Sequence, residues 1–188
     1  MVWAPDAIWD SDKGQYLVHW ASKFYSEDDP AHTGDAVTTE IIRYAHTSDF
    51  KTFTTPSTYI NLETATAIDL SFLQVDENTF LRFYVNGNVS GPVGEISTDG
   101  LFGTWTATSG TIEGRTNYEA PYPYWDNVDN GTAYLVCDQV SSTAGWHGWK
   151  STDPTSGSFT TEDTDLTYMR HGSVLSVTQE QYDALQAL

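Results

Sequence analysis

The sequence predicts an all-β fold of propeller type, formed as a single domain over residues 1–188. Three observations support this prediction. Aromatic and β-branched residues, which favour strands, dominate the chain. Short apolar runs are separated by Asn-Gly, Asp-Gly and related turn residues. The acidic residues that open three similar stretches, Asp6, Asp69 and Glu119, are 63 and 50 residues apart. A repeat of this length indicates stacked supersecondary units.

Each repeat contains four predicted strands, which is the number in one propeller blade. Each also crosses an acidic turn before its second, aromatic-rich strand, as in Gln15–Trp20 after the turn at Asp10. The three blades are predicted at about 4–60, 67–112 and 118–169. Their strands are expected at 7–9, 15–21, 39–46 and 52–54; at 70–73, 80–85, 93–97 and 103–107; and at 121–125, 133–139, 145–151 and 157–160.

The last predicted segment, residues 170–188, begins as the innermost strand of a fourth blade and ends in a helix. The strand is expected over 170–175. Thr178 followed three residues later by Gln181 is a capping-box pattern, which predicts that the helix begins at Gln179. The chain is therefore expected to form a partial propeller of about three blades plus the start of a fourth.

The charge and the cysteine content exclude several classes of function. The chain has 8 Lys and Arg residues against 26 Asp and Glu residues, a formal charge of −18. Such a surface repels phosphate backbones and anionic lipid, so neither nucleic acid nor a membrane is expected as a partner. Cys137 is the one cysteine, which excludes an intrachain disulfide and a Cys-based zinc site.

The repeat predicts that carboxyl groups gather at the centre of the propeller. Innermost strands line the axis, so Asp6, Asp69, Glu119 and, in the fourth unit, His171 are expected at one equivalent place. Asp69 and Glu119 adjoin apolar and aromatic residues, including Phe72 and Tyr118. Apolar surroundings raise the pKa of a carboxyl group by desolvation, which suits a general acid. The competing interpretation, strongest for Asp6, is that such carboxylates only cap loops.

Four motifs together resemble glycoside hydrolase family 43. In chain order they are Trp3-Ala-Pro-Asp6, Ala67-Ile-Asp-Leu-Ser-Phe72, Glu119-Ala-Pro121 and Arg170-His-Gly-Ser-Val174. Members of that family are five-bladed propellers that act on arabinan, arabinoxylan and xylan. The resemblance implies a pentose-containing oligo- or polysaccharide as the partner and an extracellular location.

The resemblance also implies roles for individual residues in an inverting glycosidase. Glu119 corresponds to the general acid and Asp69 to the residue that tunes and orients it. Trp3 and Asp6 would line the sugar pocket, with Phe72 and Tyr118 as further substrate contacts. No cofactor is required. His171 corresponds to an axial histidine that helps to hold a central Ca²⁺ in some members, and a histidine bonded only to backbone is the equal alternative.

The resemblance places the general base in a strand upstream of Trp3, where this chain begins. Weak or absent hydrolysis is therefore expected, because the attacking water would lack a proton acceptor. The alternative is a catalytically inactive carbohydrate-binding or residual structural fragment. An open ring of blades also exposes strand edges, so self-association, as a homodimer or similar assembly, is expected.

Overall fold

The protein folds into three four-stranded antiparallel sheets, which confirms the all-β prediction. The structure is a computed structural model and describes residues 1–140, 145–166 and 169–188. The strands follow chain order within each sheet: β1 (Trp3–Asp10), β2 (Gln15–Ser22), β3 (Ile41–Thr47) and β4 (Ser57–Ile60); β5 (Ala67–Gln74), β6 (Phe80–Asn86), β7 (Pro92–Ser97) and β8 (Thr106–Ala107); and β9 (Tyr118–Trp125), β10 (Ala133–Gln139), β11 (Trp146–Ser151) and β12 (Thr160–Leu166).

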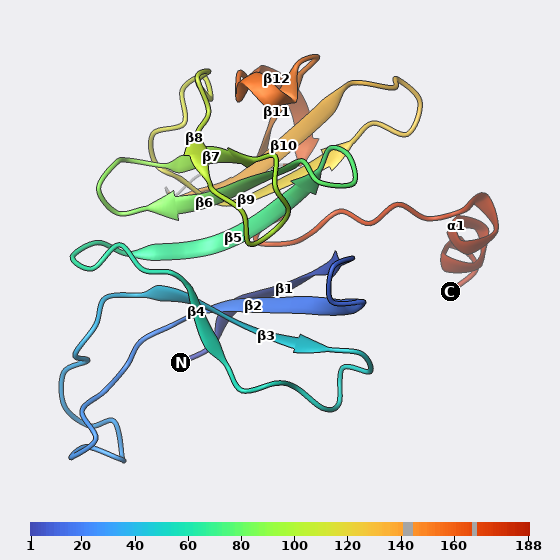
Figure 1. The fold of residues 1–188 in the computed structure, drawn as a ribbon. Coiled ribbons are helices and arrows are strands. Elements are labelled where there is room, and N and C mark those ends of the chain that lie inside the picture. Colours follow the sequence, from blue (N-terminus) through green and yellow to red (C-terminus); the bar gives the residue numbers. More distant parts are fainter. Residues whose placement is uncertain (141–144, 167–168) are drawn as a thin grey trace.

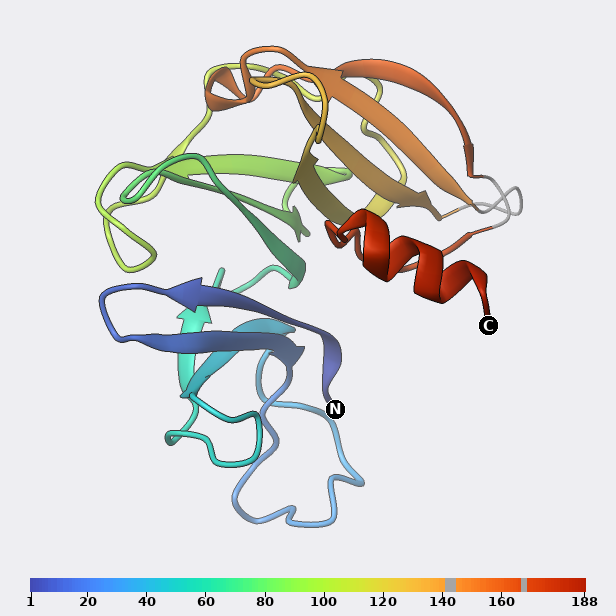
Figure 2. The same cartoon turned by 90° about the vertical axis from the view of Figure 1, so that its right-hand side faces the viewer.

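The first strand of each sheet lies on the inside of the assembly. β5 packs beside both β1 and β9, so the three strands that begin the sheets are neighbours although they are far apart in the sequence. Figures 1 and 2 show the sheets fanning out from this centre. Among the described residues, no helix has the length and apolar character needed to cross a membrane.

The acidic turns between the first and second strands share one hydrogen-bonding pattern. The side chains of Asp10, Asp76 and Asp126 each accept backbone N–H groups from the residues two and three positions later. Aspartate favours such turns because its short carboxylate can bond its own backbone. The repeated acidic residues of the sequence therefore include hairpin caps as well as candidate functional groups.

The main hydrophobic core lies between the second and third sheets. Leu81, Phe83, Leu135, Trp149 and Phe159 are at most 1% exposed there. The rings of Phe83 and Phe159 meet edge to face, with their centroids 5.5 Å apart. A smaller cluster, which includes Ile42, Leu70 and Tyr84, joins the first sheet to the second. The sheets thus bury their facing surfaces and hold the inner strands together.

Each innermost strand begins three or four residues earlier than predicted, and the largest differences from the predicted boundaries are at the outermost strands of the first and third sheets. The first sheet ends with Ser57–Ile60 instead of 52–54, and the third ends with Thr160–Leu166 instead of 157–160. Residues 52–54 form no strand because side-chain hydrogen bonds hold this segment: the Asp49 carboxylate accepts the N–H of Thr52, and the Thr54 hydroxyl accepts the N–H of His46. At 157–160 the chain leaves the short 3₁₀ helix Pro154–Ser156 through Gly157, whose φ is 77°.

Residues 169–178 form no strand, so the expected innermost strand of a fourth blade is wrong. The N–H of His171 donates to the side chain of Asp138 instead of a strand carbonyl. The predicted helix does follow, as α1 (Gln179–Gln186), with the full capping box between Thr178 and Gln181. The helix buries none of its residues and lies at the end of an extended segment in Figure 1.

Candidate active site

Each innermost strand carries the same irregularity, a β-bulge with one extra residue. Residues 3–6 of β1, 68–71 of β5 and 119–122 of β9 each lie opposite only three residues of the neighbouring strand. The second residue of each bulge has a positive φ: 43° at Ala4, 56° at Asp69 and 52° at Ala120. Residues other than glycine seldom adopt this conformation, and such strain is concentrated at functional sites.

The bulges correct the predicted equivalence of the acidic residues. Asp69 shares its backbone position with Ala4 and Ala120, and His171 has a matching φ of 52°. These four residues are 65, 51 and 51 positions apart. Glu119 therefore precedes the equivalent position by one residue, and Asp6 follows it by two. The sequence repeat aligned acidic side chains by type, whereas the fold aligns the bulges.

The bulges surround a cavity of about 250 Å³. Its walls come from all three innermost strands and from the segment that follows the third sheet. The lining residues are Ala4, Pro5, Asp6, Asp69, Leu70, Ser71, Ala120, Pro121, Tyr122, His171, Gly172 and Ser173. Asp6, Asp69 and His171, three of the residues selected from the sequence, thus line one cavity.

Asp69 is the most buried carboxyl group on the cavity wall, with 6% of the residue exposed. Its Oδ2 accepts the N–H of Ala120 at 3.1 Å, and its Oδ1 lies 3.9 Å from Nε2 of His171. Burial raises the pKa of Asp69 above its ordinary value. The His171 charge and the Ala120 N–H oppose this rise, while the negative charges of Glu119 and Asp138 add to it.

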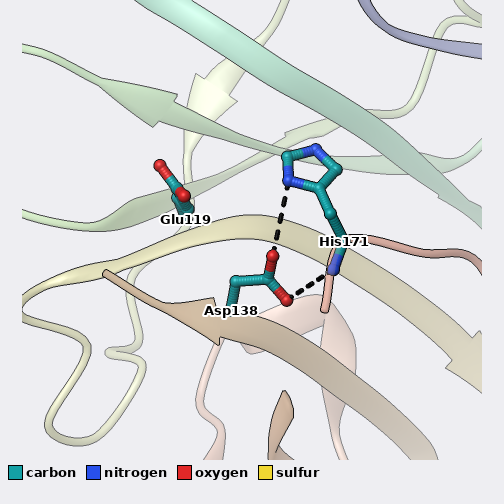
Figure 3. A group of neighbouring side chains, drawn as sticks. All are labelled: Glu119, Asp138 and His171. Carbon is teal, nitrogen blue, oxygen red and sulfur yellow. Dashed lines mark hydrogen bonds and ion pairs between the residues drawn. The ribbon is translucent and has the colours of Figure 1, made fainter. Parts of the chain in front are cut away.

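Glu119 lies next to the cavity, one residue before the lining residue Ala120. Its side chain is 24% exposed, and its Oε1 accepts a hydrogen bond from Nη2 of Arg170 at 2.8 Å. Figure 3 shows Glu119, Asp138 and His171 gathered in one group; Asp138 accepts a hydrogen bond from the backbone N–H of His171, and its other oxygen lies 3.4 Å from Nδ1 of the His171 ring. Asp69 therefore lines the cavity, whereas Glu119, from the adjacent sheet, is not a lining residue, although its charge still acts on the Asp69 carboxyl group.

Asp6 and Tyr122 lie together on another part of the cavity wall. Oδ1 of Asp6 accepts the N–H of Ala7 at 2.8 Å, and burial raises the pKa of Asp6 against this bond. Burial and the Asp6 charge raise the pKa of Tyr122 to about 12, so its phenol stays protonated at neutral pH. An acceptor and a donor of this kind suit recognition of sugar hydroxyl groups.

Three predicted substrate contacts lie away from the cavity. Trp3 is 50% exposed at the start of β1 and is not a lining residue. The ring of Phe72 packs against His19, Tyr59 and Trp105 between the first two sheets. The ring of Tyr118 packs on His147 and Trp149. Beyond the bulge of β5, neighbouring residues point to opposite faces of the strand, so Phe72 turns away from the cavity that Ser71 lines.

The sequence reasoning missed Asp138, Tyr122 and the contact made by Arg170. Asp138 is 0% exposed and receives the backbone N–H of His171 at 2.8 Å. Its one sequence signal is a charged residue directly after the apolar run from Tyr134 to Cys137. Arg170 stood in a recognised motif, but its partner Glu119 is 51 positions away and only the fold joins them.

The residues around His171 do not fit a central calcium ion as they are arranged. Glu119, Asp138 and His171 each offer one ligand atom, and these atoms lie within 4.8 Å of one another. Calcium prefers six to eight oxygen ligands, and this set contains an imidazole nitrogen. The guanidinium of Arg170 lies 2.8 Å from Glu119 and 3.6 Å from Asp138, so a cation already contacts both carboxylates.

The raised pKa of Asp69 predicts a pH-dependent effect of Asp69→Asn. A carboxyl group whose pKa is raised by folding stabilises the protein at pH values below its ordinary pKa of 3.8. This contribution is lost as the pH rises through the raised pKa of the folded state. Asparagine tolerates positive φ and still accepts the Ala120 N–H. At pH 7 the variant should be more stable by about 0.5–2 kcal/mol.

Thermal melts of both proteins between pH 3.5 and 7.5 would measure this difference. The gain should shrink toward the acid end, where the wild-type carboxyl is protonated in both states. A constant difference across the range would show that the Asp69 charge is not the cause.

A family comparison covers the whole of this site. Residues 1–183 match the model of a probable glycosyl hydrolase domain, a family related to glycoside hydrolase family 43. Among curated proteins, a 62-residue segment is 37% identical to an α-L-arabinofuranosidase of Bifidobacterium longum subsp. longum. That segment is 30% of this chain and 6% of the relative.

Solved structures of glycoside hydrolases share the fold at low sequence identity. The catalytic domain of a family 62 α-L-arabinofuranosidase from Coprinopsis cinerea has a TM-score of 0.60 at 13% identity, over 85% of this chain and 50% of that one. An endo-1,5-α-L-arabinanase from Thermotoga petrophila has a TM-score of 0.57 at 15% identity, over 82% of this chain and 39% of that one. A family 117 glycoside hydrolase from Zobellia galactanivorans has a TM-score of 0.58 at 14% identity, over 87% of this chain and 56% of that one.

The extent of these matches separates the family assignment from the question of activity. This chain spans between 39% and 56% of those three structures, and 6% of the curated relative. The family model, in contrast, matches nearly the whole chain and confirms the resemblance read from the four motifs. The chain belongs to the probable glycosyl hydrolase domain family that is related to glycoside hydrolase family 43.

Proposed function

We propose that this domain hydrolyses glycosidic bonds in arabinose-containing polysaccharides outside the cell. The observation that carries the proposal is a cavity lined by Asp6, Asp69 and Tyr122, with Glu119 one residue before the lining residue Ala120 and close enough for its charge to act on Asp69. Paired carboxyl groups at a sugar-sized cavity are the usual equipment of glycoside hydrolases. The arabinofuranosidase and arabinanase relatives favour arabinose over xylose as the substrate sugar.

Glu119 is proposed as the proton donor and Asp69 as the group that orients it. In an inverting reaction, Glu119 gives its proton to the leaving oxygen as the bond from that oxygen to the anomeric carbon breaks. Water attacks the opposite face of the sugar, forms the new carbon–oxygen bond and gives a proton to a second carboxylate, for which Asp6 is the candidate among the residues that line the cavity. Asp69 lies beside Glu119 and stays largely buried, so it suits an orienting role better than water activation.

Asp6 is the carboxylate that β1 contributes to the cavity wall. Its Oδ1 is bonded to the Ala7 N–H, and the resemblance assigns it to contact with a sugar hydroxyl. A variant with Asp6→Asn therefore separates two roles. Loss of sugar affinity alone would indicate hydroxyl recognition, whereas loss of turnover at unchanged affinity would indicate water activation.

Hydrolysis of linear arabinan, 4-nitrophenyl α-L-arabinofuranoside and the matching xyloside tests the proposal. The expected result is release of arabinose with inverted anomeric configuration, read by proton NMR before mutarotation. Binding of arabino-oligosaccharides without turnover by calorimetry would instead assign the domain to carbohydrate binding. If the domain neither binds nor hydrolyses any of these sugars, the proposed function is contradicted.

A further inference from the structure

Asp138, near the end of β10, is a fully buried carboxyl group that the proposed reaction does not use. The residue is 0% exposed, and its ladder partner across the third sheet is Glu119. Removing a carboxylate from water costs several kcal/mol unless partners compensate it. Its contacts therefore indicate what this buried charge is for.

The contacts of Asp138 go to two consecutive residues of the segment after the third sheet. Oδ1 accepts the backbone N–H of His171 at 2.8 Å. Oδ2 lies 3.4 Å from Nδ1 of His171 and 3.6 Å from Nε of Arg170. Within the part of the chain that the structure describes, Oδ2 accepts no hydrogen bond, so its neighbours are these two basic side chains. Figure 3 shows the bonds to His171.

Arg170 and His171 in turn contact Glu119, the proposed proton donor, and Asp69, the group proposed to orient it; these two residues are called the acid pair. Nη2 of Arg170 donates to Oε1 of Glu119 at 2.8 Å, and Nε2 of His171 lies 3.9 Å from Oδ1 of Asp69. No strand ladder holds residues 169–178. Asp138 thus anchors the segment from which both contacts to the acid pair are made.

We propose that Asp138 is the positioning residue of this active site, acting through Arg170 on Glu119 and through His171 on Asp69. The inference rests on the proposed function. Because Arg170 holds Oε1 of Glu119, Oε2 is the oxygen left to deliver the proton to the leaving group. Loss of the Asp138 charge should let Arg170 and the 170–171 segment move, and the proton of Glu119 would then be poorly aimed.

The substitution Asp138→Asn tests the proposal because asparagine keeps an acceptor for the His171 N–H and removes the charge. On linear arabinan, kcat should fall by about 10- to 100-fold, the scale expected for misplacing a catalytic group, with KM little changed. A 2,4-dinitrophenyl arabinofuranoside has a leaving group that needs no protonation, so its turnover should fall much less. A purely structural role of Asp138 would lower both rates alike.

Asp10→Asn is the matched control. Asp10 is also buried, at 3% exposed, and is paired with a histidine, His46, at 2.8 Å, but it lies in a hairpin turn outside the cavity. This variant should lose stability without any change in the ratio of the two rates. Arg170→Gln, at a half-exposed side chain, should reproduce the leaving-group effect and not add to that of Asp138→Asn.

Each outcome bears on a different claim. If the wild type is active and Asp138→Asn lowers the turnover of both substrates equally, the positioning role is overturned and the proposed function stands. A wild type inert on both substrates would contradict the proposed function, and the positioning role with it. Should Asp138→Asn fail to fold, Arg170→Gln alone decides, because an unchanged rate ratio in that variant breaks the link to Glu119.

Discussion

Replacing Glu119 by glutamine should lower kcat/KM on linear arabinan by about 100- to 10,000-fold, the usual contribution of general acid catalysis. Glutamine has the shape of glutamate and can still accept the hydrogen bond from Arg170, so the fold and the cavity should persist. It carries no proton that it can release to the leaving oxygen. The loss should therefore appear in kcat, measured by reducing-sugar release under saturating substrate.

Glu162→Gln is the matched control for that substitution. Glu162 is exposed on β12, in the same sheet as Glu119 but at its outer edge. The control should keep wild-type kcat and KM, because the same change of charge is made away from the cavity. Equal losses in the two variants would mean that net charge, and not proton donation by Glu119, governs the rate.

The second large effect is expected in the core, where Trp149→Ala should destabilise the protein by about 3–5 kcal/mol. Trp149 is 1% exposed, its indole N–H donates to the carbonyl of Glu113 at 2.7 Å, and the ring of Tyr118 packs edge to face on it at 4.9 Å. The substitution leaves a cavity and an unpaired carbonyl between the second and third sheets. Urea denaturation followed by tryptophan fluorescence would measure the loss.

Trp9→Ala is the comparison for the core substitution. Trp9 is 46% exposed on β1 and packs on Tyr16 with ring centroids 5.0 Å apart. Removing a half-exposed ring leaves no enclosed void, so its cost should be clearly smaller. If the two alanine variants unfold at the same urea concentration, the cluster around Trp149 is not the principal core.

Local sequence patterns were enough to predict the fold class and several residues of the site. Aromatic-rich runs such as Gln15–Trp20 and the recurring Asp turns encode strands and hairpins over a few positions, which is the range that pattern reasoning covers. Asp6, Asp69 and His171 were found on the cavity wall because the four family motifs fall on the innermost strands and the segment that follows them.

The remaining features depend on backbone conformation and on contacts across the fold. Nothing in the residue type marks Ala4 or Ala120 as having positive φ, so the bulges and the equivalence of Asp69 with these two alanines stayed hidden. The bulges and the alternation of strand faces decide that Ser71 lines the cavity while its neighbour Phe72 does not. Asp138 gained its significance only through partners that lie more than 30 positions away.

The most direct test of the account is a crystal structure of the Glu119→Gln variant soaked with an arabino-oligosaccharide. The account predicts a sugar ring in the cavity between Asp6, Asp69 and His171, with the glycosidic oxygen within hydrogen-bonding distance of the side chain at position 119. An oligosaccharide bound elsewhere on the protein, with this cavity filled only by water, would contradict it.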